Sequence, residues 1–410
     1  MERCVELALE NNPKLRAAHW EVATTRAQST AAASARLPHL RALGSYAHTL
    51  DEARLVPTHR NGEPGVFGDD LWAADLVLTL PLFTGGRLVN EVRASELLLD
   101  AARQRLGRTR DELVFNVSSL FYTILGQERV VESLQFSLQA LEHHRSRVEQ
   151  LLRAQKAARV DLLRTEVRLA DLQQRLVREQ NVVAIQRRGL LNLLGLEKAP
   201  EAWALRGDLT LAAEAPDLTE AVAAAENQRP DYQAARAALE AEARRVDVAR
   251  GARWPSLSLR GSYGWRWAAG ATQHPSGTQT AEDVGSLAFL VDVPLFEGGR
   301  LDAREREARA RLAAARERLR QLELQILLDV ETAVRNIASS RRRVEATRAA
   351  VTQAEESFRI EREKYTYGKG TITDVLDAQS ALLDAQTQLY RALADHRIAR
   401  AQLHLAVGES

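Results

Sequence analysis

The sequence has little of what most globular enzymes depend on. Aromatic residues make up only 5% of its 410 residues, and the single cysteine, Cys4, excludes an intramolecular disulfide. No apolar run reaches the ~18 residues of a membrane-spanning helix, and residues 1–6 lack the apolar core of a signal peptide. The 56 basic and 55 acidic side chains are interspersed, so nucleic-acid binding gains no support.

What is abundant favours long helices. Charged residues reach 27%, and Ala, Leu, Arg, Glu and Gln dominate, a composition typical of coiled coils. The apolar spacing predicts helices over about 2–36, with a fresh start at Pro13, then over about 88–156 and 160–194. The second half repeats this order, with a long helix over about 301–367 and a last helix ending near Val407.

A repeated motif shows that the chain is one unit written twice. The sequence Pro-Leu-Phe-x-Gly-Gly-Arg begins at Pro81 and again at Pro294, a shift of 213 residues. Each copy ends an alternating apolar strand and precedes a helix, so its glycines are predicted to turn the chain with positive φ. The predicted strand-to-helix turns contain Pro81, Gly85, Gly86, Pro294, Gly298 and Gly299. We therefore expect a first repeat over 1–195, a linker over 196–216 and a second repeat over 217–410.

Four amphipathic strands are predicted, two in each repeat. They begin near Leu40, Leu71, Leu257 and Leu287, and the fourth is expected to run to Phe296. Each alternates apolar side chains with polar ones, and the apolar faces are long enough to cross a hydrocarbon layer when tilted. Tyr263, Trp265 and Trp267 at one strand end suit an aromatic girdle at a membrane interface. A half-buried sheet in a soluble protein alternates in the same way, so that alternative stays open.

Strand number and helix length decide between the alternatives. Four strands cannot close a barrel, because the smallest spanning barrels have about eight, and open edges are forbidden in lipid. A membrane barrel would therefore have to be shared among several chains. Each repeat also offers one helix of ~100 Å and two shorter ones that could stack to the same length. A soluble coiled-coil scaffold would explain the helices but not four strands inserted symmetrically.

These features together identify a resemblance. The tandem repeat, the two Pro-Leu-Phe-x-Gly-Gly-Arg motifs and Asp374–Gln379 after a glycine-containing helix break resemble the TolC family of outer-membrane efflux proteins. The resemblance implies an α+β membrane protein: a homotrimer with a shared 12-stranded β-barrel in the bacterial outer membrane and a helical tunnel in the periplasm. It also implies a passive exit duct that docks to a periplasmic adaptor and, through it, to an inner-membrane transporter. Family members carry a secretory signal, so we infer a truncated or processed start.

The resemblance also places a periplasmic gate. It implies gate contacts among Asp161, Tyr365, Asp374 and Asp377, and an adaptor-docking tip at Gly368, Lys369, Gly370 and Thr371. In a trimer Asp374 and Asp377 would form acidic rings that favour cations. Alternatively, Asp374 caps the first turn of the last helix. The other tip, residues 154–158, lacks glycine and is a less certain docking point.

Signals for catalysis are poor. His143 and His144 are adjacent on a helix and point apart, so solvated side chains are expected rather than a metal pair. Gly368–Thr371 lacks the upstream glycine and the preceding strand of a phosphate-binding loop. We expect no enzyme activity and no cofactor.

Overall fold

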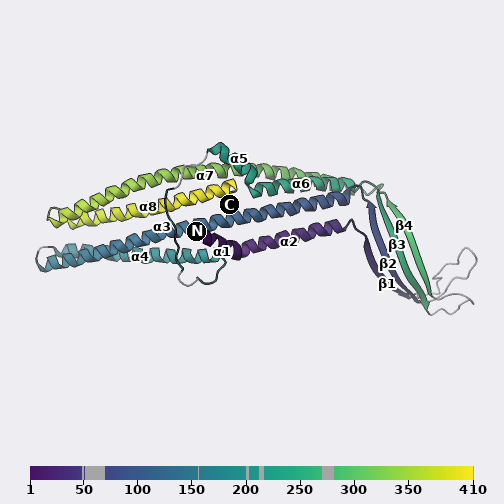
Figure 1. The fold of residues 1–410 in the computed structure, drawn as a ribbon, viewed down its shortest axis with the longest axis horizontal. Helices are drawn as coiled ribbons and strands as arrows, with labels where there is room; N and C mark the ends of the chain where they lie inside the picture. Colours follow the sequence, from purple (N-terminus) through teal and green to yellow (C-terminus); the bar gives the residue numbers. More distant parts are fainter. Residues whose placement is uncertain are drawn as a thin grey trace, which may run out of the picture. The chain divides into compact units, whose positions relative to one another are not determined.

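The chain forms eight helices and four strands among the residues that the structure describes. A computed structural model describes residues 1–48, 50, 70–155, 157–199, 203–211, 217–269 and 281–409. The proline- and glycine-containing stretch 51–69, the loop 270–280, Lys156 and parts of the linker lie outside these residues. The elements in chain order are α1 (Glu2–Asn11), α2 (Pro13–Ser34), β1 (His39–His48), β2 (Asp70–Phe83), α3 (Arg87–Arg153), α4 (Arg159–Leu193), α5 (Leu218–Gln228), α6 (Pro230–Gly251), β3 (Ser256–Ala269), β4 (Ala281–Asp292), α7 (Arg300–Thr366) and α8 (Ile372–Val407) (Figure 1).

The element order confirms the predicted duplication. α3 and α7 are both 67 residues long, and α2 and α6 are both 22. Two compact units are present: one contains Met1–Glu21, Arg103–Ala234 and Arg320–Ser410, the other Val22–Ala102 and Ala235–Leu319. Each unit therefore takes segments from both repeats.

The first unit is helical, and its core lies along the seams between helices. One cluster joins α3, α4 and α8 through Val130, Leu134, Leu141, Leu169, Leu172, Ile372, Leu376 and Leu383. A second joins α1, α2, α3 and the end of α4, and a third joins α5, α7 and the end of α8. Apolar residues at helical spacing fill these seams, which is how long charged helices gain tertiary stability.

Equivalent polar residues hold the two places where a short helix follows another. The Asn12 side chain caps α2 by accepting from the Lys14 and Leu15 amides, and its Nδ2 donates to the Leu193 carbonyl at 2.8 Å. At the equivalent position, Arg229 donates to the Ala406 carbonyl at 3.3 Å. Gln228 and Pro230 flank Arg229, so it lies between α5 and α6. Both junctions are thereby fastened to the end of a neighbouring helix.

The second unit contains one antiparallel sheet in the order β1-β2-β3-β4 (Figure 1). Pairing places alternate residues of all four strands on a common face. The apolar face contains Leu40, Ala42, Tyr46, Trp72, Leu76, Leu78, Tyr263, Trp265, Trp267, Leu287, Phe289 and Val291. The opposite, mixed face contains Arg41, Ser45, Asp75, Thr79, Arg260, Ser262, Arg266 and Ser286.

Glycine pairs turn the chain from strand to helix in both repeats. Gly85 and Gly86 have φ of 62° and 80°, and Gly298 and Gly299 have 59° and 83°. A side chain would be strained at these angles. The first turn is also crowded, because a Cβ on Gly85 would lie 2.4 Å from the Gly251 carbonyl oxygen.

The fourth strand differs from the prediction. It begins at Ala281 and ends at Asp292, so Pro294 and Phe296 lie outside it, whereas Pro81 and Phe83 belong to β2. In the first repeat Phe83 is held opposite Leu257 of β3. Strand β4 is the last in the sheet and has no further strand beside it in the described part of the chain. The difference therefore follows from the missing neighbour.

Candidate functional site

The tip between α7 and α8 is built by a glycine turn and a capping box. Gly368 has φ of 72°, and Thr371 caps α8. The Asp374 carboxylate accepts hydrogen bonds from the Thr371 amide at 3.0 Å and the Thr371 hydroxyl at 2.7 Å. The Thr371 hydroxyl and amide lower the pKa of Asp374. The cap is consequently intact above the usual carboxyl pKa and is lost as the pH falls through the lowered value.

The tip between α3 and α4 has the same backbone without glycine. Gln155 has φ of 59° and lies 213 residues before Gly368. Asp161 also repeats the role of Asp374, since its carboxylate accepts from the Ala158 amide at 3.3 Å. The two tips are tied together by Arg164, which donates to the Thr373 hydroxyl at 2.8 Å.

A groove of about 600 Å³ lies between these tips. Four of the predicted gate and tip residues line it, namely Asp161, Tyr365, Gly368 and Gly370. Burial and the Asp161 carboxylate raise the pKa of Tyr365, which keeps the phenol neutral. Asp374 and Asp377 do not line the groove. Asp377 is exposed and has no hydrogen bond or ion pair within the described residues.

Sequence reasoning missed one member of this groove. His144 is half-buried rather than solvated, and its ring lies 5.5 Å from the Tyr365 ring. Burial and Arg147 lower its pKa, so the imidazole is neutral at pH 7. Its Nε2 finds no hydrogen-bond partner in the described part of the chain. The expectation failed because Tyr365 is far away in sequence. His143 is exposed, as predicted.

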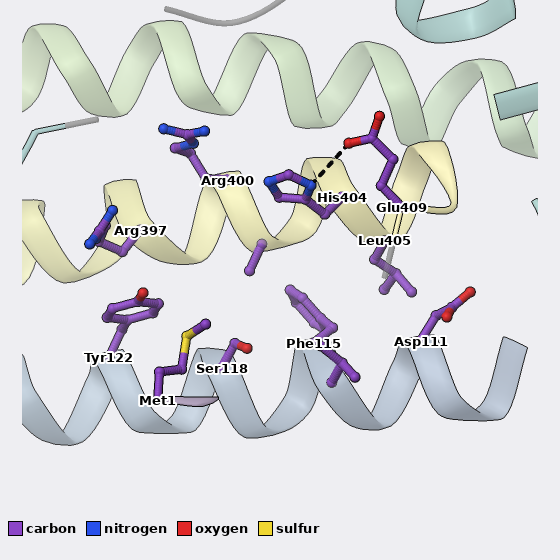
Figure 2. A pocket seen from close by; sticks show the side chains of 12 residues that line it. Met1, Asp111, Phe115, Ser118, Tyr122, Arg397, Arg400, His404, Leu405 and Glu409 are labelled. Atoms are coloured by element: carbon purple, nitrogen blue, oxygen red, sulfur yellow. Dashed lines mark hydrogen bonds and ion pairs between the residues drawn. The ribbon is translucent and has the colours of Figure 1, made fainter. Parts of the chain in front are cut away.

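A second cavity of about 460 Å³ separates α3 from α8 near the chain termini (Figure 2). Arg397, Arg400 and His404 enter from α8, and Phe115 and Tyr122 from α3. The Arg397 guanidinium lies 5.2 Å from the Tyr122 ring centre, and His404 contacts Glu409 at 3.2 Å. These contacts hold the helix ends together. No group of three potential metal ligands exists among the described residues.

Aromatic rings form a continuous row at the loop end of the sheet's apolar face. Ring centres are 4.6 Å apart for Tyr46 and Trp72, 6.4 Å for Trp72 and Trp267, and 6.3 Å for Trp265 and Trp267. The row thus extends beyond the three residues proposed from sequence, because strand pairing brings β1 and β2 alongside β3. On the mixed face, Arg266 bonds Asp75 at 2.8 Å.

The family is decided by a match that spans both repeats. The model of the outer membrane efflux protein family matches residues 4–196 and 221–409. The chain belongs to this family.

Relatives of this efflux protein cover it almost end to end. It is 25% identical to the pyoverdine export outer membrane protein OpmQ of Pseudomonas putida, over 100% of this chain and 85% of OpmQ. It is 22% identical to the outer membrane protein TolC of Vibrio cholerae, over 98% of this chain and 89% of TolC. A Pseudomonas aeruginosa membrane protein shares its fold with a TM-score of 0.85 at 23% identity, covering 99% and 93% of the two chains. The Vibrio cholerae outer membrane protein VceC gives 0.82 at 21%, covering 99% and 95%.

The helices of this efflux protein are not membrane spans. None of those described combines the length and apolar character that crossing a bilayer requires.

Proposed function

We propose that the chain is one subunit of a trimeric outer-membrane exit duct that exports substrates passively. Membership of the outer membrane efflux family supports the location and the transport role. The described residues offer no metal-binding cluster, and the tip lacks a phosphate-binding motif. Energy would therefore come from an inner-membrane transporter, reached through a periplasmic adaptor.

The sheet is the observation that carries this proposal. One face is apolar and exposed, with Leu287 71% and Phe289 67% accessible, while the other face contains charged side chains. Lipid on one side and water on the other would satisfy both faces. The sheet has two open edges, β1 and β4, and open edges are not tolerated in lipid. Three copies would supply twelve strands and close the barrel.

The helices support the same assembly. α4 exposes apolar side chains on one face, at Val160, Leu163, Val167, Val177 and Ile185. Exposed apolar stripes of this kind mark interaction sites. Neighbouring subunits packed along them would complete a tunnel wall.

The tips support a gate and a docking point. We assign the periplasmic gate to Asp161, Tyr365, Asp374 and Asp377, and adaptor docking to Gly368, Lys369, Gly370 and Thr371. Asp161 and Tyr365 line one groove with Gly368 and Gly370, so an adaptor that enters the groove would contact the gate directly. Because Thr371 already engages the Asp374 carboxylate, Asp377 is the better candidate for the acidic ring.

Planar bilayers test the channel itself. The purified protein should insert from detergent and give discrete conductance steps. A protein that stays in the aqueous fraction without detergent and gives no steps would rule out the duct.

Asp377→Asn should weaken cation preference. A unit charge about 4 Å from an ion contributes roughly 1 kcal/mol in water, so removing one carboxylate per subunit should lower the cation-to-anion permeability ratio several-fold. Reversal potentials in a salt gradient measure this ratio. Asp395→Asn is the matched control, because Asp395 is exposed on the same helix but paired with Arg343 at 2.7 Å. Equal reversal potentials in both variants would remove Asp377 from the gate.

A further inference from the structure

The duplication extends to the residue-by-residue register of the strands. His39 lies opposite Thr79 in the first hairpin, and Ser256 lies opposite Asp292 in the second. The first strands of the two repeats are related by a shift of 217 residues, and the second strands by 213. Applying both shifts to the pair His39 and Thr79 gives Ser256 and Asp292. The two hairpins are therefore equivalent in detail.

Only one of the two possible seams between hairpins lies within the chain. β2, the second strand of repeat one, pairs with β3, the first strand of repeat two. The complementary seam would join β4, the second strand of repeat two, to β1, the first strand of repeat one. In the described chain β1 and β4 are instead the two edges of the sheet.

We propose that β4 pairs antiparallel with β1 of a second copy, in the register that the internal β2·β3 seam dictates. This inference rests on the proposed trimeric duct and specifies its subunit boundary. Shifting Leu76 opposite Tyr263 gives Phe289 opposite Tyr46 of the second copy. Shifting Leu78 opposite Gly261 gives Val291 opposite Gly44, and shifting Val77 opposite Ser262 gives Leu290 opposite Ser45.

The faces of the strands agree with this register. Phe289 and Tyr46 both belong to the apolar face, and so do Val291 and Gly44. Leu290 and Ser45 both belong to the mixed face. A slip of one residue would move every side chain of one strand to the wrong side. The aromatic ring of Phe289 would also continue the apolar surface across the boundary toward Tyr46.

The unfinished end of β4 independently supports a second copy. Leu295 and Phe296 are 92% and 88% exposed, more than almost any other large apolar residue described. The equivalent Phe83 is paired with Leu257, and the shifted pair is Phe296 opposite Leu40. A second copy would therefore extend β4 through Pro294 to Phe296, the end that the sequence pattern predicts.

The adjoining turns show the same vacancy. At Gly85, an added Cβ would lie 2.4 Å from the Gly251 carbonyl oxygen and 2.5 Å from the Trp254 Cβ. At the equivalent Gly298, nothing lies within 4 Å. The shifted partners are Ser34 and Leu37, and Leu37 is 59% exposed. The turn at Gly298 is thus shaped for the end of α2 from a second copy.

Paired cysteines test the register. In a Cys4→Ser background, Leu290→Cys is combined with Ser45→Cys, and the controls combine it with Leu43→Cys or Ala47→Cys. All three β1 positions lie on the same face. Directly opposite Cα atoms are about 4.5–5.5 Å apart, within the ~7 Å limit for a disulfide, whereas diagonal positions exceed it. We expect the Ser45 pair to form a covalent trimer under mild oxidation at least about five times more completely than either control.

The mass of the unoxidised oligomer separates the two levels of the proposal. A trimer in which a control pair cross-links best, or in which no pair cross-links, overturns this register and leaves the duct in place. A stable monomer in detergent and in lipid removes the duct and the register together.

Discussion

Replacing Arg229 by methionine should lower the free energy of unfolding by about 3–5 kcal/mol, the cost of leaving a buried ion pair without one partner. Arg229 is only 1% exposed. Its guanidinium donates to both oxygens of Asp231 at 3.0 and 2.7 Å, and to Asp329 at 3.0 Å. Methionine fills much of the volume but leaves two carboxylates at the α5–α6 junction without their cation. Urea titration of the detergent-solubilised protein, followed by circular dichroism, measures the loss.

The Arg229 network also predicts a pH dependence. Burial opposes ionisation of Asp231, but its hydrogen bonds with Arg229 lower the pKa of the carboxyl overall. The stabilisation is therefore fully present above the usual carboxyl pKa and is lost as the pH falls through the lowered one. The difference between wild type and Arg229→Met should accordingly shrink in acid.

Two control variants isolate the buried pair. Arg244→Met removes an exposed arginine that contacts Glu240 at 3.3 Å, and it should cost less than about 1 kcal/mol. Adding Asp231→Asn and Asp329→Asn to Arg229→Met should restore part of the stability, because it neutralises the stranded carboxylates. Similar small losses for Arg229→Met and Arg244→Met would contradict the assigned role of the junction.

Replacing Leu287 by arginine should prevent assembly in the outer membrane. Leu287 lies on the apolar face and is 71% exposed. An arginine facing lipid costs about 2–4 kcal/mol near the bilayer midplane, and a trimer would bear this cost three times. We expect the variant to disappear from the outer-membrane fraction and to accumulate as degraded or aggregated protein. Immunoblots of separated membranes measure the distribution.

The neighbouring residue provides the matched control. Ser286 lies on the mixed face, where its hydroxyl is 2.7 Å from that of Ser262. Ser286→Arg introduces the same charge one residue away but toward the water-filled side. It should lose at most one hydrogen bond, worth about 1 kcal/mol, and remain in the outer membrane. Equal loss of both variants, or equal tolerance, would contradict the assignment of the two faces.

Much of the fold could be predicted because it is written locally and twice. Alternation of apolar residues located the four strands, and the glycine pairs at Gly85 and Gly298 located the turns into the long helices. Pro13 and Pro230 marked the junctions, since proline suits a helix start. The structure confirms this order of elements.

The remainder depends on contacts that no local pattern reveals. The end of β4 was wrong because Phe296 has no strand to pair with inside its own chain. His144 was placed wrongly because its neighbour Tyr365 belongs to another helix. Gln155 adopts the backbone of Gly368 without glycine, so the sequence offered no signal for an equivalent tip. The gate residues stay a prediction, since their roles depend on neighbouring subunits.

The central claim is that three copies together complete what one copy leaves open. Light scattering of protein extracted from the outer membrane, corrected for bound detergent, tests it most directly. The duct predicts a protein mass about three times the 45.5 kDa of the chain. A mass of one or two chains that persists after reconstitution in lipid would contradict it.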